Sequence, residues 1–184
     1  MKHDLRMITL SLATAVGVSM SPAAFAAGDG GSGASDTTSQ CRNGKVWDKR
    51  QGKCVDPQKG AIDDDSLYEA GRDLAYAGRY DQAIDVLTLA SNRNDKRILN
   101  FLGFAHRKAG RLEVGIGYYL QALEIDPEYA LVREYYGEAL LMKGDLEGAR
   151  AQLSAIESLC GSQACEEYQD LAEDIEAFEK TRDG

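Results

Sequence analysis

The sequence is poor in the residues that most often carry out chemistry. Only two histidines occur among 184 residues, and one of them, His3, lies in the N-terminal head. No serine, cysteine or carboxylate group has the spacing of a catalytic motif, and the acidic run from Asp63 to Asp65 lacks the downstream Gly and Glu of a calcium loop. We therefore predict no catalytic residue, no metal site and no cofactor. We expect His106 to be a packing residue on a helix.

Basic residues and long apolar runs are also scarce. The formal net charge is −9, and only the stretch from Arg42 to Lys59 is basic, with six basic residues against two acidic ones. An acidic body repels phosphate backbones, so we predict that nucleic acid is not a partner. Beyond Met20 no apolar run approaches the length of a bilayer span, so we also predict no membrane span.

The first residues have the pattern of a secretory signal peptide. Lys2 and Arg6 precede an apolar run, Met7 to Met20, and small residues follow it up to Ala27. This pattern predicts a signal peptide over residues 1–26, cleaved after Ala26, and a periplasmic or secreted protein. The alternative is an uncleaved amphipathic anchor.

A flexible linker is predicted next, over residues 27–40, because this stretch is rich in Gly, Ser and Thr and has no large apolar residue. Residues 41–57 then form a small two-stranded loop between Cys41 and Cys54. The four cysteines allow three connectivities. Two local bridges, Cys41 with Cys54 and Cys160 with Cys165, are the simplest in an exported chain; a redox or metal pair at Cys160 and Cys165 is the alternative. We expect the loop to have almost no core of its own.

The loop from Cys41 to Pro57 resembles one hairpin of the small cysteine-rich chitin-binding modules. Those modules also place a glycine, an aromatic and an acidic residue between two cysteines, but four of their cysteines are absent here. The resemblance implies that Trp47 contacts a glycan, since an indole can stack on a sugar ring. The alternative is that Trp47 covers the disulfide.

Three anchor residues recur at steps of 32 and then 34 residues. They are a first glycine, a turn glycine seven residues later, and a small residue five residues further on. Such a unit is a helical hairpin, in which the first glycine allows close helix approach and the second forms a left-handed turn. The three series are Gly71, Gly103 and Gly137; Gly78, Gly110 and Gly144; and Ala83, Gly115 and Ala149.

On these residues the chain resembles the tetratricopeptide repeat (TPR) family. The central copy carries the motif most fully, with Leu99, Leu102, Gly103, Gly115, Tyr119, Ala122 and Pro127 in order. The resemblance implies an all-α fold, a solenoid of three helical hairpins over about 64–95, 96–129 and 130–163 within a domain of 63–180. The apolar stripe of Ala164, Tyr168, Leu171, Ile175 and Phe178 predicts a capping helix over about 164–180.

The family resemblance also implies a binding surface, because the first helix of each hairpin lines the concave groove. This groove would bind a protein or peptide partner in the cell envelope, and the protein would be an adaptor or scaffold. The alternative is a glycan-binding protein that uses the Trp47 loop, with the repeats as a spacer. The predicted groove residues are Tyr68, Arg72, Tyr76, Arg97, Asn100, Phe104, Arg107, Lys108, Glu134, Tyr135 and Glu138. Neither the partner's identity nor the oligomeric state follows from the sequence.

Overall fold

The computed structural model describes residues 37, 40–58 and 60–182. The predicted signal peptide, 1–26, and all but two residues of the predicted linker lie outside them. Within the described part of the chain, no helix is both long and apolar enough to cross a bilayer.

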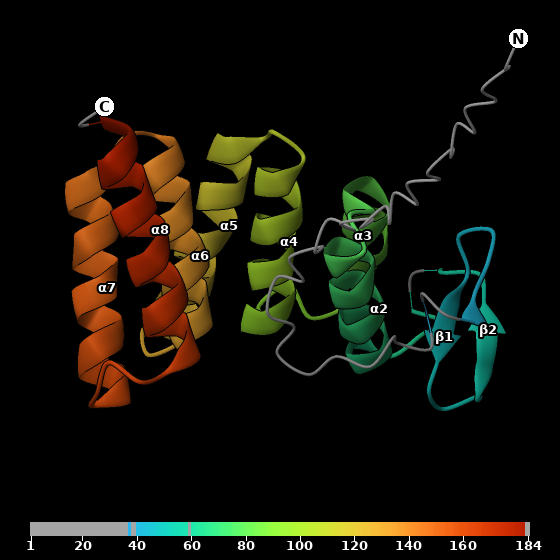
Figure 1. Cartoon of the computed structure of the whole chain (residues 1–184). Coiled ribbons are helices and arrows are strands. Elements are labelled where there is room, and N and C mark those ends of the chain that lie inside the picture. The colour runs from blue at the N-terminus through green and yellow to red at the C-terminus, as the bar shows by residue number, and fades with distance from the viewer. Residues whose placement is uncertain (1–36, 38–39, 59, 183–184) are drawn as a thin grey trace, which may run out of the picture. The chain divides into compact units, whose positions relative to one another are not determined.

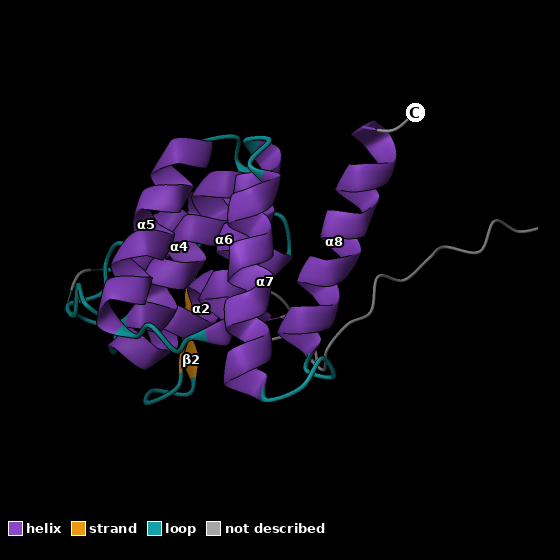
Figure 2. Cartoon of the chain, turned by 90° about the vertical axis from the view of Figure 1, so that its left-hand side faces the viewer, coloured by secondary structure: helices purple, strands orange, loops and turns teal. Residues whose placement is uncertain are grey.

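Seven helices in three hairpins and a final single helix make up most of this part of the chain. Each hairpin helix packs on its partner, and neighbouring hairpins pack on each other in sequence order (Figure 1). The last helix, α8, packs on both helices of the third hairpin, and Figure 2 shows it beside α7. The predicted helical-hairpin fold is therefore confirmed. The helices are α2 (Asp64–Tyr76), α3 (Tyr80–Leu87), α4 (Lys96–Lys108), α5 (Leu112–Ile125), α6 (Ala130–Met142), α7 (Leu146–Cys160) and α8 (Glu166–Arg182).

Local sequence signals explain where the helices begin and turn. The Asp63 carboxylate accepts a hydrogen bond from the Ser66 amide at 2.9 Å and so caps α2. Asp95 and Asp145 cap α4 and α7 in the same way. The turn glycines of the three hairpins all have positive φ, with Gly110 at 82°, a conformation in which a side chain would be strained.

The first glycine of each hairpin receives a large side chain from another helix. A Cβ atom at Gly71 would lie 2.3 Å from the Leu87 side chain, and one at Gly103 would lie 2.5 Å from the Tyr119 ring. In the third hairpin the equivalent slot, Gly137, is filled by Leu171 of α8 rather than by α7. The final helix α8 therefore packs on the solenoid through the same kind of contact that joins the helices of the first two hairpins, a large side chain against a glycine.

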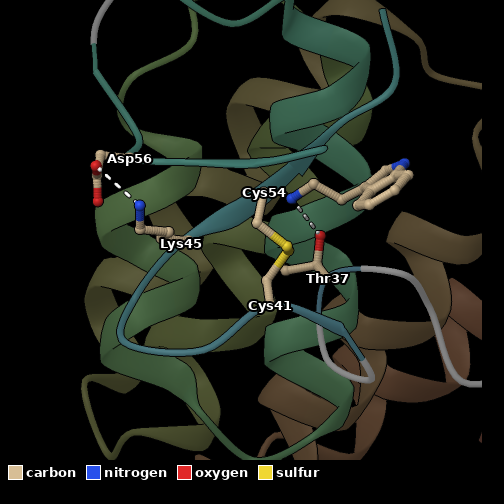
Figure 3. The surroundings of a disulfide bond; sticks show 6 residues. Thr37, Cys41, Lys45, Cys54 and Asp56 are labelled. Carbon is tan, nitrogen blue, oxygen red and sulfur yellow. Dashed lines mark hydrogen bonds and ion pairs between the residues drawn. A yellow bond between two sulfur atoms is a disulfide. The ribbon is translucent and has the colours of Figure 1, made fainter. Parts of the chain in front are cut away.

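The Cys-bracketed loop is a short antiparallel hairpin of β1 (Val46–Asp48) and β2 (Lys53–Val55), in which Trp47 pairs with Cys54. Figure 3 shows the Cys41–Cys54 disulfide, whose Cα atoms are 5.6 Å apart. The second bridge joins Cys160 and Cys165. Both predicted local disulfides are thus present.

The hairpin shares the core of the repeats, because it packs on α2. Val46 is fully buried and belongs to the apolar core of the repeats. Asp48 is also fully buried, and its carboxylate accepts hydrogen bonds from the amides of Arg50 and Gln51. The Lys49 amide donates to the Ser66 hydroxyl on α2. The hairpin therefore covers the open end of the first repeat.

Candidate functional site

Aromatic side chains from the first helix of every hairpin meet on one surface. Tyr76 of α2 lies edge-on to Phe101 and Phe104 of α4, with ring centroids 5.4 and 5.7 Å apart. Tyr135 of α6 contacts Phe104 at 5.1 Å. The hydroxyl groups of Tyr76 and Tyr135 are 3.1 Å apart and hydrogen-bonded, so the first and third hairpins touch across α4. We call Tyr76, Phe101, Phe104 and Tyr135 the aromatic floor.

The accessibility of the aromatic floor is uneven. Phe101, Phe104 and Tyr135 are buried, whereas the Tyr76 side chain is half exposed, at 51%. A ring that is exposed on one side and packed on two other rings is held in place without being covered. Tyr76 is therefore the residue of this surface best placed to contact a partner.

Cations border the aromatic floor at the α2–α4 side. The Arg97 guanidinium lies 4.8 Å from the centre of the Tyr68 ring and forms an ion pair with Asp65. Arg72 lies over the same ring at 5.8 Å. Lys108, at the other end of α4, lies 5.6 Å from the Phe104 ring. Positive charge held over aromatic faces is favourable. Arg72 and Lys108 are also paired with carboxylates, so this border consists of ordered cations within ion pairs.

Arg107 is the buried connection between the aromatic floor and the third hairpin. Its side chain is only 2% exposed and forms an ion pair with Glu138 of α6. It also donates to the Tyr119 hydroxyl at 3.2 Å and lies over the rings of Phe104 and Tyr135. These interactions hold the pKa of Arg107 above its ordinary value despite burial. Arg107 is therefore a structural cation rather than a free binding group.

A hollow of about 430 Å³ lies beside Arg107, between α4, α6 and α8. Apolar side chains and charges both line it, and Met142 at its border is 57% exposed. The lining residues are Arg107, Lys108, Glu138, Leu141, Met142, Asp174, Ala177, Phe178 and Thr181.

The α6–α8 side of the surface is acidic. We call Glu134, Glu138, Asp170 and Asp174 the acidic end. Glu134 is only 6% exposed. Burial, followed by the charges of Glu138 and Asp170, raises the pKa of Glu134 to about 9. Burial and neighbouring carboxylates also raise the pKa values of Asp170 and Asp174.

The raised pKa of Glu134 predicts a pH-dependent loss of stability. The unfolded chain releases this proton near the ordinary pKa of 4.5, whereas the folded chain keeps it up to about 9. The unfolded state therefore binds fewer protons between these values, and stability falls as the pH rises through them. Glu134→Gln should raise the free energy of unfolding by roughly 4–5 kcal/mol near pH 8 and leave it unchanged below about pH 4.5.

Urea unfolding at both pH values measures this effect. Glu124→Gln is the matched control, because Glu124 is exposed on α5 and has no ion pair within the part of the chain that the structure describes. Equal stability of Glu134→Gln and the parent at both pH values would contradict the assigned environment of Glu134.

The structure places the predicted groove residues at different depths. Tyr76 and Lys108 are exposed, while Tyr68, Arg72, Arg97 and Glu138 are partly buried. Asn100 is fully buried, with both polar atoms of its amide unpaired, so it offers no surface to a partner in this structure. The buried remainder is Phe104, Arg107, Glu134 and Tyr135.

The contribution of α8 to this surface is not predicted from the sequence. Its apolar stripe suggests only a cap, yet Asp170 and Asp174 belong to the acidic end. Asp174 and Phe178 also line the hollow. The available signal was the regular series of first glycines. A third such slot at Gly137 needs a large residue, and Leu171 supplies it from the helix in the position of a fourth first helix.

Two further residue groups have structural explanations. His106 is half-buried and stacks on Tyr118 with ring centroids 5.4 Å apart, while its Nδ1 accepts a hydrogen bond from Arg111. This agrees with a packing role. Cys160, Cys165 and Glu167 lie close enough to hold a metal ion, but both sulfur atoms are in the disulfide and are not available as thiolate ligands.

Trp47 lies on β1 and is partly buried. Its amide donates to the Thr37 hydroxyl at 3.2 Å. The structure does not test the predicted glycan contact, which stays a prediction.

Solved structures with similar folds include two that are bound to peptides. The type III secretion translocator chaperone SycD of Yersinia enterocolitica superposes with a TM-score of 0.56 at 21% identity, over 65% of this chain and 86% of that one. SycD in complex with a peptide of the translocator YopD gives a TM-score of 0.53 at 22% identity, over 64% and 93%. The first TPR of Spaghetti (RPAP3), bound to the HSP90 peptide SRMEEVD, gives 0.56 at 19% identity, over 71% and 98%.

Comparison with curated proteins finds no significant match. A family model described as tetratricopeptide repeat matches residues 68–130 and 105–164, which together cover more than half of the chain. The protein therefore belongs to the tetratricopeptide repeat family.

Proposed function

We propose that this protein is an exported TPR adaptor that binds a segment of a partner protein along the surface formed by α2, α4, α6 and α8. The observation that carries the proposal is the aromatic floor, where a half-exposed Tyr76 is fixed over buried rings from two other hairpins. Exposed aromatic residues held by packing are typical anchors of protein interfaces. The role is one of binding and not of catalysis.

The similar structures support peptide binding as a class of function. SycD binds a peptide of YopD, and the Spaghetti domain binds an HSP90 peptide. Their identities to this chain are near 20%, so they support the ability of the fold to hold a peptide and not the choice of peptide. The family resemblance implies Lys, Asn and Arg at set groove positions where a TPR protein binds an acidic chain end; Tyr68, Leu131 and Tyr135 stand at several of these positions, which argues against such a ligand.

The location in the cell envelope rests on two features of the sequence and structure. The head of the chain has the pattern of a secretory signal peptide, and both cysteine pairs form disulfides, which persist in oxidising compartments. We infer that the partner segment is met in the periplasm or outside the cell.

Peptide selection tests the proposed surface. Peptides selected from a random phage library by the mature chain, residues 27–184, should bind Tyr76→Ala roughly tenfold or more weakly than the parent. Tyr118→Ala is the matched control, because Tyr118 is a partly buried tyrosine on α5 that packs on His106. Its affinity should stay within about twofold of the parent. Selected peptides that lose affinity in Tyr118→Ala but not in Tyr76→Ala would place binding elsewhere.

A further inference from the structure

Within the part of the chain that the structure describes, three of the four carboxylates at the acidic end have no hydrogen bond or ion pair. Both nearby cations, Arg107 and Lys108, form ion pairs with Glu138. Glu134, Asp170 and Asp174 have neither a hydrogen bond nor an ion pair among the residues that the structure describes. Asp170 and Asp174 are exposed and can be hydrated, so their lack of a partner is ordinary.

Glu134 is different because the residue as a whole is only 6% exposed, although its carboxylate oxygens are not fully buried. A buried polar group normally has a hydrogen-bonding partner, and a buried carboxylate without a cation is costly when ionised. Glu134 also has Glu138 and Asp170 as electrostatic neighbours, which adds like-charge repulsion. An arrangement that reduces stability in this way is typical of a binding site.

Glu134 lies next to the aromatic floor and not on the far side of α6. The phenol groups of Tyr76, Tyr119 and Tyr135 all interact electrostatically with it. On the other side, Glu166, Glu167 and Asp170 of α8 interact with it as well. The hollow beside Arg107 is lined by Glu138 of α6 and Asp174 of α8, so a side chain entering it would meet carboxylates from both helices.

The spacing of these carboxylates fits an organic cation better than a metal ion. Across the described residues, the one acid or cysteine group compact enough for a metal is Cys160, Cys165 and Glu167. The oxygens of the acidic end are more widely spread. A Lys ammonium or Arg guanidinium presents several donors and can reach spread acceptors.

We propose that the acidic end binds a Lys or Arg side chain of the same peptide whose apolar residues contact the aromatic floor, with Glu134 as the buried acceptor. This inference rests on the proposed function and gives the partner segment its chemical class, a basic residue beside an apolar or aromatic anchor. Arg72 and Arg97 lie over the Tyr68 ring, at the α2 side of the aromatic floor. The two signs of charge therefore fix the direction of the peptide.

A double-mutant cycle tests the inference. Phage selection with the mature chain should enrich Lys or Arg at one fixed distance from the apolar anchor, and the selected peptide is then synthesised with Lys and with norleucine at that position. Glu134→Gln should weaken the Lys peptide roughly tenfold or more, norleucine should weaken binding to the parent similarly, and the two changes together should cost little more than either alone. Glu124→Gln, on α5, should leave both affinities unchanged.

The outcomes separate this inference from the proposed function. One outcome is a set of peptides that depend on Tyr76, show no enrichment of Lys or Arg and bind Glu134→Gln with unchanged affinity. That result would overturn the inference but not the proposed peptide groove. Peptides that do not depend on Tyr76 would overturn both. Unfolding of the variant cannot account for weaker binding, because Glu134→Gln is expected to be at least as stable as the parent.

The pH dependence of binding gives an independent readout. Binding of a cation favours ionised Glu134, so affinity for the Lys peptide should rise between about pH 6 and 9 in the parent and stay nearly flat in Glu134→Gln. Affinity that is independent of pH in the parent would contradict Glu134 as the acceptor. The charged or titratable groups around Glu134 are Tyr76, Tyr119, Tyr135, Glu138, Glu166, Glu167 and Asp170, with Arg107 and Lys108 beyond Glu138.

Discussion

Replacement of Gly115 by alanine should destabilise the protein by about 3 kcal/mol. A Cβ atom at this position on α5 would lie 2.7 Å from the carbonyl oxygen of Gly103 and 3.0 Å from the amide nitrogen of Arg107. Both are backbone atoms of α4, so a change of side-chain rotamer cannot relieve the clash. The two helices of the central hairpin would have to separate, which would also loosen Tyr119 and Arg107.

Gly117→Ala is the matched control for this change. Gly117 lies two residues further along α5, and a Cβ atom there meets no atom within 4 Å. Alanine favours helix over glycine by up to about 1 kcal/mol, so this variant should be neutral or more stable. Thermal and urea unfolding of the two variants measure the difference. Equal stability of both would show that α4 and α5 do not approach at Gly115.

Arg107→Ala should cost about 3–5 kcal/mol of stability. The change leaves Glu138 facing other carboxylates with only Lys108 as a partner, at 3.7 Å. It also removes the cation from the faces of Phe104 and Tyr135 and the donor to the Tyr119 hydroxyl. Two hairpins lose their shared contact at once.

Arg93→Ala is the control for removal of an arginine. Arg93 is exposed in the loop between α3 and α4, so its replacement should change stability by no more than about 0.5 kcal/mol. A second variant, Glu138→Gln in the Arg107→Ala background, should recover part of the lost stability, because it removes the Glu138 charge that Arg107 no longer neutralises. An Arg107→Ala protein as stable as Arg93→Ala would contradict the role given to the buried pair.

The hairpins could be predicted from sequence because their determinants are local. A turn glycine with positive φ and a glycine that receives a large side chain are needed in every copy, and they recur at matching steps. The Asp63 cap depends on neighbours three residues away. Such short-range requirements leave a pattern in one sequence.

Features that depend on distant segments could not be predicted. The burial of Val46 requires the β-hairpin to meet α2, and its sequence shows only a small loop. Asn100 lies at a groove position of its helix, yet it is fully buried. The depth of a groove residue depends on how closely the neighbouring helices approach, and the helical period alone does not contain that information.

The chemistry of the groove could be predicted only in part, because it also depends on contacts between distant segments. The family resemblance implies that Tyr76 and Phe104 face the groove, but the contact of Tyr76 with Tyr135 spans 59 residues. The acidic end depends on α8 taking the place of a fourth first helix, with Leu171 in the Gly137 slot. Sequence reasoning assigned that helix the role of a cap and so missed Asp170 and Asp174.

Site-specific photo-crosslinking tests the central claim, a peptide groove on the first helices, most directly. A benzophenone amino acid replaces one exposed residue at a time in the mature chain, and a selected peptide is added. Positions 76, 108 and 142 on α2, α4 and α6 should crosslink to the peptide, whereas the exposed positions 114, 120 and 125 on α5 should not. Crosslinks from α5 with none from positions 76, 108 and 142 would contradict the claim.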